Sequence, residues 1–199
     1  MDANAVRAKQ NEDQVLVAIG SVGWLTIAQV ASWAWPDSGK HSATNRAAVV
    51  LDRLADAGLV MRRKSGNGVW GYLLTNTGAA RANDVYQWEV FRAGYDLSLL
   101  DTYRQDLIVS YLLDQVGEVK LGPAGVRGGI RSNLVDVAAL ASADALVWSP
   151  DLCAWRAALV VRTLHPETLA KARRLAAVAA DLQLLGPAHL VQQFRKGLH

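Results

Sequence analysis

One stretch decides the fold: residues 40–78 read KHSATNRAAVVLDRLADAGLVMRRKSGNGVWGYLLTNTG. Apolar residues at helical spacing in its first part predict an amphipathic helix, with Ser42 as its N-cap and Gly58 ending it. A β-prone run, Leu59–Lys64, follows and ends in three consecutive cations. A Gly-Asn-Gly turn then leads into Val69–Thr75, whose composition predicts a second strand. Helix, strand, glycine turn, strand is the order of a recognition helix followed by a β-wing.

The predicted helix has an apolar face and a polar face. The apolar positions, which we expect to face a core, are Ala43, Ala47, Val50, Leu51 and Leu54. Cations and hydrogen-bonding side chains crowd the first turns, whereas Asp52 and Asp56 occupy the later ones. A helix that enters the DNA major groove by its N-terminal end needs donors there and tolerates acids further along.

The candidate DNA contacts are therefore polar side chains of this helix and of the wing. They are Lys40, Ser42, Thr44, Asn45, Arg46, Arg53, Arg62, Arg63, Lys64 and Asn67. Thr44, Asn45 and Arg46 are expected to read bases, while Lys40 and the three wing cations hold phosphates. Taken singly, Arg46 and the wing cations are equally explained as solvated surface charges, so the prediction depends on their order and spacing.

The charge distribution agrees with a basic N-terminal DNA-binding domain followed by a neutral C-terminal part. The chain has 199 residues, 51% of them hydrophobic and 20% charged, which excludes a disordered chain and allows one large or two small domains. Residues 1–82 carry 9 Lys/Arg and 6 Asp/Glu, so the whole net charge of +3 lies there. Residues 83–199 carry 12 of each sign. An excess confined to one part indicates a nucleic-acid-binding domain.

Little in the composition points to other chemistry. The single cysteine, Cys153, cannot form an intrachain disulfide, and four distant histidines give no zinc spacing, so no metal, cofactor or catalytic residue is predicted. No signal peptide or membrane-spanning run is recognisable, and we expect a cytoplasmic protein that does not bind membranes. The tryptophans Trp24, Trp33, Trp35 and Trp70 are expected in a core or domain interface, with base stacking as the alternative.

Four segments are expected along the chain. They are a polar tail (1–10), a winged helix-turn-helix domain (11–82), a connecting segment (83–104) and a small α/β domain (105–199), which together predict an α+β protein. In the second segment, a helix over 11–21 precedes a helix over 27–35 that Thr26 caps, and Pro36–Gly39 turns into the recognition helix. Thr75–Gly78 then turns into another helix near Ala79.

The last segment predicts strands separated by a helix. The expected elements are a helix over 107–116, a glycine-rich loop over 121–131, strands over 143–149 and 154–162, a long helix over 167–185 and a final strand over 189–194. The loop lacks both phosphate-binding glycine spacings, although Arg127 and Arg131 could touch a DNA backbone. The long helix is expected to cover its own sheet, with a homodimer interface as the alternative.

The helix and wing resemble those of many bacterial winged-helix proteins. The residues that carry the resemblance are Arg46, Leu51, Leu54, Gly58, Leu59, Val60, Arg62, Arg63, Tyr72, Leu73, Leu74, Thr75 and Gly78. Among these proteins the chain is most similar to the replication-relaxation family, which includes accessory proteins of plasmid mobilisation. The resemblance covers residues 11–82 and implies double-stranded DNA and a relaxase or replication protein as partners, at a plasmid or integrative-element origin.

The C-terminal order also resembles the PD-(D/E)xK nuclease-like core that members of this family carry. That chemistry needs one Asp, then an acid and a Lys on the next strand, around a divalent metal. Asp144 matches the first acid, but the strand Ala157–Arg162 has neither an acid nor a lysine. One carboxylate is too little to hold Mg²⁺, so the resemblance implies an inactive domain in which Asp144 is a structural carboxylate.

The leading interpretation is a sequence-selective DNA-binding accessory protein that is not an enzyme. Transcriptional regulators share the helix–wing signature, so one alternative is a regulator whose C-terminal domain dimerises or senses a ligand. The other is a divalent-metal nuclease in which Asp136 or Glu167 supplies the second acid.

Overall fold

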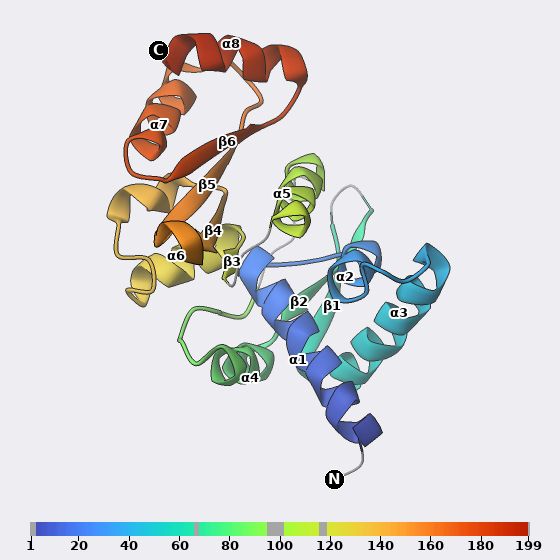
Figure 1. The fold of residues 1–199 in the computed structure, drawn as a ribbon. Helices are drawn as coiled ribbons and strands as arrows, with labels where there is room; N and C mark the ends of the chain where they lie inside the picture. Colours follow the sequence, from blue (N-terminus) through green and yellow to red (C-terminus); the bar gives the residue numbers. More distant parts are fainter. Residues whose placement is uncertain (1–2, 66–67, 95–101, 116–118, 199) are drawn as a thin grey trace. The chain divides into compact units, whose positions relative to one another are not determined.

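The computed structural model describes residues 3–65, 68–94, 102–115 and 119–198. It confirms the predicted α+β class and divides into two compact units, Met1–Leu100 (unit 1) and Asp101–His199 (unit 2) (Figure 1). Within the described ranges, no helix combines the length and the apolar character needed to cross a membrane.

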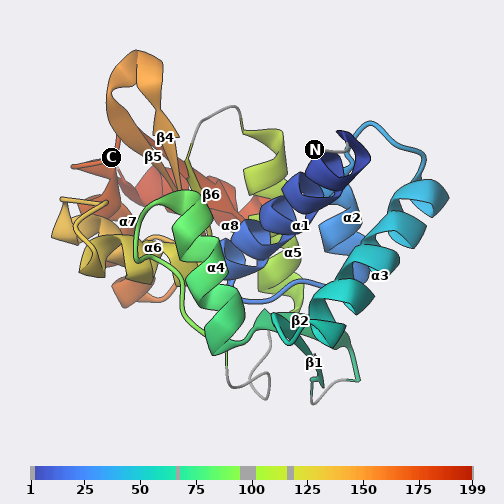
Figure 2. The same ribbon diagram turned by 90° about the horizontal axis from the view of Figure 1, so that it is seen from below.

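Unit 1 consists of helices around one β-hairpin. Its elements are α1 (Ala3–Val22), α2 (Ile27–Ala34), α3 (Lys40–Asp56), β1 (Val60–Lys64), β2 (Trp70–Leu74) and α4 (Asn76–Tyr86). The antiparallel strands β1 and β2 place Arg62 opposite Tyr72 and Lys64 opposite Trp70. Leu25, in the segment between α1 and α2, adds an isolated antiparallel bridge to Tyr72. Figure 2 shows α1 and the hairpin approaching α3 from different sides.

The core of unit 1 uses the predicted apolar face of α3. All five predicted positions of that face are buried, at 5% exposure or less. Thr26 is confirmed as the N-cap of α2, since its hydroxyl accepts from the Gln29 amide and the Gln29 side chain accepts from the Thr26 amide. This capping box is local in sequence, which is why the pattern was recognisable.

Two helix starts differ from the predictions. Residues 3–10, expected as a polar tail, form the first turns of α1, because good helix formers extend a helix whose buried side chains begin only at Val15. Ser42 is not an N-cap, because α3 already begins at Lys40 and has Gly39 as its cap, without a side-chain hydrogen bond. Ser42 is therefore the third residue of the helix, where its side chain is exposed.

The predicted connecting segment also needs correction. Residues 83–86 complete α4, and Val90 and Phe91 are buried in unit 1, where the Asn83 side chain both accepts from the Phe91 amide and donates to the Phe91 carbonyl. Residues 102–104 begin the first helix of unit 2, α5. Val90 and Phe91 are buried outside any regular element, so no periodicity in the sequence could assign them to unit 1.

The base of the hairpin is held at one point. The Thr75 hydroxyl accepts from the Gly78 amide at 3.0 Å, which caps α4, and donates to the Gly58 carbonyl at 2.6 Å. Gly78 passes so close to this turn that a β-carbon there would overlap the Leu59 carbonyl oxygen. Gly58 itself has a φ of +68°, in the left-handed region that ends helices.

Unit 2 is a four-stranded mixed sheet with helices around it. Its elements are α5 (Thr102–Asp114), β3 (Lys120–Leu121), α6 (Pro123–Arg131), two 3₁₀ turns (Ala138–Ser142 and Pro150–Leu152), β4 (Ala145–Ser149), β5 (Ala154–Val160), α7 (Pro166–Ala176), β6 (Asp181–Leu185) and α8 (Ala188–Leu198). The strand order is β3-β4-β5-β6. The pairs β3–β4 and β4–β5 are antiparallel, whereas β5 and β6 are parallel and joined through α7.

Three predicted elements of unit 2 are wrong. The glycine-rich loop is the helix α6, which Pro123 begins and whose glycines are buried in close contact, Gly129 lying against Leu121 and Val135. The long helix ends at Ala176, and 181–185 form β6, since the run DLQLL alternates with a period of two inside an alanine-rich context. The expected final strand is the helix α8, whose less exposed residues Leu190, Val191 and Phe194 have helical spacing.

The close approach at Gly78 generates the first testable prediction. Replacing Gly78 with Ala forces the backbone at Leu59 to move, so the free energy of unfolding of unit 1 should fall by about 2 kcal/mol. Gly39→Ala is the matched control, because a β-carbon there meets nothing within 4 Å. Equal denaturant midpoints for the two variants would contradict this account of the hairpin base.

Tyr111 of α5 gives a prediction about pH. Burial, assisted by Asp181 and opposed by Arg156, raises the pKa of the Tyr111 phenol from 10.0 to about 12. The neutral phenol is favoured in the folded state, so its stabilising contribution is complete below pH 10 and is lost as the pH rises through 12. Between these values the wild type should lose about 2 kcal/mol more stability than Tyr111→Phe in parallel denaturant titrations. Parallel curves for the two proteins would contradict it.

Candidate nucleic-acid interface

The exposed surface of α3 does not present its candidate residues as one strip. Since each residue advances about 100° around a helix, Thr44 and Arg46 project about 200° apart, with Asn45 between them. Arg53, seven residues after Arg46, returns to within about 20° of the same flank. The surface opposite the core is therefore centred near Asn45, and Arg46 and Arg53 line one of its edges.

Hydrogen bonds fix several of these side chains. The Thr44 hydroxyl donates to the Lys40 carbonyl at 2.8 Å, so its proton is already used in a hydrogen bond within α3. The Asn45 amide nitrogen lies 3.2 Å from Nε2 of His41, one turn earlier, which orients the carboxamide. Arg46 donates to the Ser38 hydroxyl at 3.4 Å, in the turn before α3. Among the three predicted base readers, Asn45 thus lies most centrally on the exposed surface.

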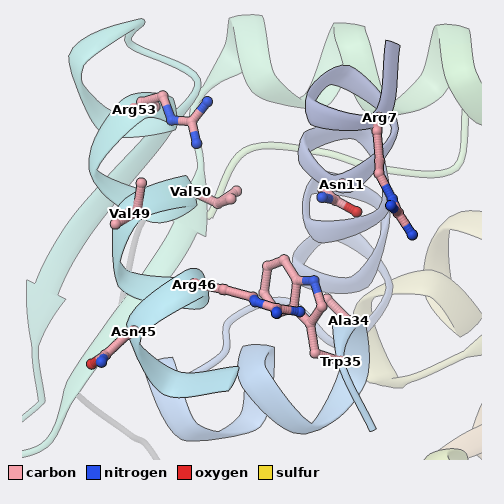
Figure 3. A pocket seen from close by; sticks show the side chains of 9 residues that line it. All are labelled: Arg7, Asn11, Ala34, Trp35, Asn45, Arg46, Val49, Val50 and Arg53. Carbon is pink, nitrogen blue, oxygen red and sulfur yellow. The ribbon is translucent and has the colours of Figure 1, made fainter. Parts of the chain in front are cut away.

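An open groove runs along the Arg46 edge of α3 (Figure 3). Its volume is about 720 Å³, and it is lined by Arg7, Asn11, Ala34, Trp35, Asn45, Arg46, Val49, Val50 and Arg53. Arg46 reaches from α3 toward Trp35, whereas Asn45 projects away from α1. Three guanidinium groups line the groove and no carboxylate does. Within the described part of the chain, none of the three forms an ion pair.

Sequence reasoning missed the α1 side of this groove. Arg7 fell in the expected polar tail, and only the continuation of α1 through residues 3–10 carries it to the groove. Arg81 of α4 holds α1 by ion pairs with Glu12 and Asp13 at 3.0 and 2.7 Å. Burial lowers the pKa of Arg81, but its bonds to these two carboxylates outweigh that effect and raise it.

The hairpin borders another edge of α3 and carries the other cations. The Arg62 guanidinium carbon lies 4.2 Å and the Lys64 ammonium nitrogen 5.7 Å from the centre of the Trp70 ring. Trp70 is 45% exposed, so the two cations and the indole form one solvent-facing surface held by cation–π attraction. Arg63 is exposed on the other face of the strand, and Asn67 lies outside the described residues.

Trp70 therefore belongs to the candidate interface and not to a core. The signal that could have found it is the hairpin register, because Lys64 and Trp70 are directly opposite and project from the same face. The remaining predicted residues Lys40 and Ser42 are exposed at the start of α3. Asp52 and Asp56 are exposed on its later turns, as the sequence suggested.

The nuclease alternative depends on Asp144, but both oxygens of its carboxylate make structural contacts. One carboxylate oxygen pairs with Arg104, and the other accepts from the Val160 amide at 2.6 Å. The Glu167 side chain is 84% exposed and lies 3.9 Å from His165, and Asp136 is exposed. Across the described ranges, no three His, Cys, Asp or Glu side chains come together as a metal site would require.

Comparison with known protein families, with curated proteins and with solved structures found no match to this chain. The geometry of α3, its groove and the hairpin is therefore the basis for a functional proposal. What these residues can do together is bind an extended polyanion, because cations lie on α3, along the groove and on the hairpin, and uncharged hydrogen-bonding groups are exposed in the first turns of α3.

Proposed function

We propose that unit 1 is a winged helix-turn-helix domain that binds double-stranded DNA, with α3 in the major groove and the β1–β2 hairpin as its wing. One observation carries the proposal: Arg7, Arg46 and Arg53 line one edge of α3, and Arg62 and Lys64 lie on the hairpin. The major groove of DNA is complementary to this arrangement, because its base edges lie between two negatively charged phosphate backbones.

The individual roles follow from position. Asn45, at the centre of the exposed face, has the carboxamide that pairs with adenine in the major groove, and Arg46 suits guanine or a neighbouring phosphate. Lys40, Arg53 and the hairpin cations contact phosphates, and Arg7 is a further phosphate contact. Asp52 and Asp56 repel phosphates, so only the first turns of α3 enter the groove.

The biological role that we propose follows the family resemblance. The protein would act without catalysis, as an accessory factor for a relaxase or replication complex at a plasmid or integrative-element origin. Unit 2 would be an inactive nuclease-like domain. The structural contacts of both Asp144 carboxylate oxygens, with Arg104 and with the Val160 amide, support this. Ala172 and Leu175 of α7 are buried within the unit, which favours a helix that covers its own sheet over a dimer interface. Control of a promoter remains the second candidate, because regulators share the helix–wing signature.

Duplex binding is tested by fluorescence anisotropy on DNA tiled across the flanks of the gene and any nearby transfer origin. Arg46→Ala should weaken binding to the preferred duplex about tenfold or more and reduce its preference over other duplexes. The double variant Arg62→Ala/Lys64→Ala should bind every duplex less tightly, with a log–log salt slope shallower by about two, since both cations lie on the same face of the hairpin. A site at the transfer origin supports the accessory role, and a site in the promoter supports regulation. If wild type binds no duplex at low salt, DNA binding by unit 1 is wrong.

The groove gives a separate prediction with a control on the same helix. Arg7→Ala should lower the affinity for all duplexes and reduce the salt slope by about one, since one phosphate contact is lost. Lys9→Ala removes the same charge from an exposed position of α1 that does not line the groove. Equal effects of the two changes would mean that only the overall charge of α1 matters, and the groove would have no specific contact with DNA.

A further inference from the structure

One face of the β1–β2 hairpin ends in an exposed tryptophan. Successive side chains alternate between the two faces of a strand, so Trp70, Tyr72 and Leu74 of β2 share one face. Tyr72 and Leu74 are buried, at 3% and 1% exposure, whereas Trp70 is 45% exposed. The face that begins in the core of unit 1 therefore ends in an indole ring that solvent reaches.

Two cations lie over this indole. Lys64 pairs with Trp70 across the two strands, and Arg62 precedes Lys64 by two residues on the same face. The Arg62 guanidinium carbon is 4.2 Å and the Lys64 ammonium nitrogen 5.7 Å from the ring centre. Within the part of the chain that the structure describes, neither cation forms an ion pair. Both can therefore hold a phosphate while they remain next to the ring.

The combination of an exposed ring with cations is particular to the hairpin. Trp88, in the segment after α4, is 46% exposed in the same unit, but across the described ranges no cation lies over its ring. Contacts to duplex phosphates use cations and need no ring, because paired bases keep their faces against one another in the stack. An unpaired base exposes its face, and sites for single strands combine cations with aromatic rings on which such bases stack. An acidic peptide would use the cations but has no need of the indole.

The same hairpin face adjoins α3. Burial raises the pKa of the Tyr72 phenol, Arg62 lowers it and Asp52 of α3 raises it, so a charge from the hairpin and one from α3 both lie near this ring. The hydrogen bond from the Thr75 hydroxyl to the Gly58 carbonyl also fixes the base of the hairpin to the end of α3. The indole and its two cations are therefore within reach of DNA that α3 binds.

We propose that Arg62, Lys64 and Trp70 form a site for single-stranded DNA, with an unpaired base stacked on the indole and the adjoining phosphates held by the two cations. When α3 holds a duplex, a condition that rests on the function proposed above, this site takes a strand that is unpaired next to that duplex. The protein then prefers a duplex with a single-stranded extension to a fully paired one.

The test is fluorescence anisotropy of the full-length protein with labelled DNAs that share one duplex sequence. The duplex is used blunt, with a tail of about ten thymidines on either strand, and with an equally long tail of abasic nucleotides. The thymidine tail should tighten binding about fivefold or more, because a stacked base adds to the phosphate contacts. The abasic tail has the same phosphates but no bases, so it should give a clearly smaller gain.

Variants of Trp70 separate the ring from the cations. Trp70→Leu keeps an apolar side chain but removes the ring, so the thymidine tail should lose its advantage over the abasic tail while the blunt duplex binds nearly as before. Trp70→Phe has a smaller ring and should keep part of that advantage. Trp88→Leu is the matched control, since Trp88 is equally exposed in unit 1, and it should keep all of it. Thermal unfolding identifies any variant that fails to fold, and the comparison of the two tails on the wild type then carries the test.

Equal gains from the two tails, an unchanged thymidine advantage in Trp70→Leu, or its loss in Trp88→Leu would each overturn the proposal. Tighter binding of an oligouridylate than of the matching oligothymidylate would overturn the choice of DNA over RNA. The oligothymidylate without a duplex distinguishes this site from the proposed function. If no duplex binds, but the oligothymidylate binds and Trp70→Leu weakens it, the single-strand site stands and duplex binding by unit 1 is wrong. If the duplex binds and the thymidine tail adds nothing, only the single-strand site is wrong.

Discussion

The contact of Gly78 with the turn after α3 is the constraint on which the candidate interface depends. The Leu59 amide donates to the Leu54 carbonyl, the Leu59 carbonyl accepts from the Thr75 amide, and the Thr75 hydroxyl donates to the Gly58 carbonyl. The end of α3, both strands of the hairpin and the start of α4 are thus joined within a few residues. Because the hairpin is fixed at its base, Arg62 and Lys64 keep a defined position beside α3.

The parts of the fold that the sequence predicted are those set by local interactions. The buried face of α3 follows a single helical period, and the cap at Thr26 needs only residues three apart. The errors lie where tertiary contacts decide: β6 forms because it pairs with β5, and α6 has a glycine at position 129 where Leu121 of β3 and Val135 pack closely against it. For the candidate site, the cations of α3 and of the hairpin were predictable, whereas Arg7 and Trp70 depend on long-range geometry.

Both units use the same physical arrangement for positive charge. In unit 1, Arg62 and Lys64 lie over the Trp70 ring, and in unit 2 Arg162 lies over the Tyr103 ring. An aromatic face lowers the cost of holding cations close together, while the ring remains exposed for contact with a ligand. No carboxylate lines the groove beside α3, and Asp144 in unit 2 is bound to a backbone amide and an arginine.

The first half of α1 has a mechanical consequence. None of the described side chains between residues 5 and 14 is buried, and Arg81 grips the helix at Glu12 and Asp13. The ion pairs hold α1 at Glu12 and Asp13, between the buried residues that begin at Val15 and the preceding residues 5–11, none of which is buried. Arg7 and Asn11 of this segment line the groove, so the Arg81 ion pairs, which hold α1 next to them, also set the width of the groove and the reach of Arg7.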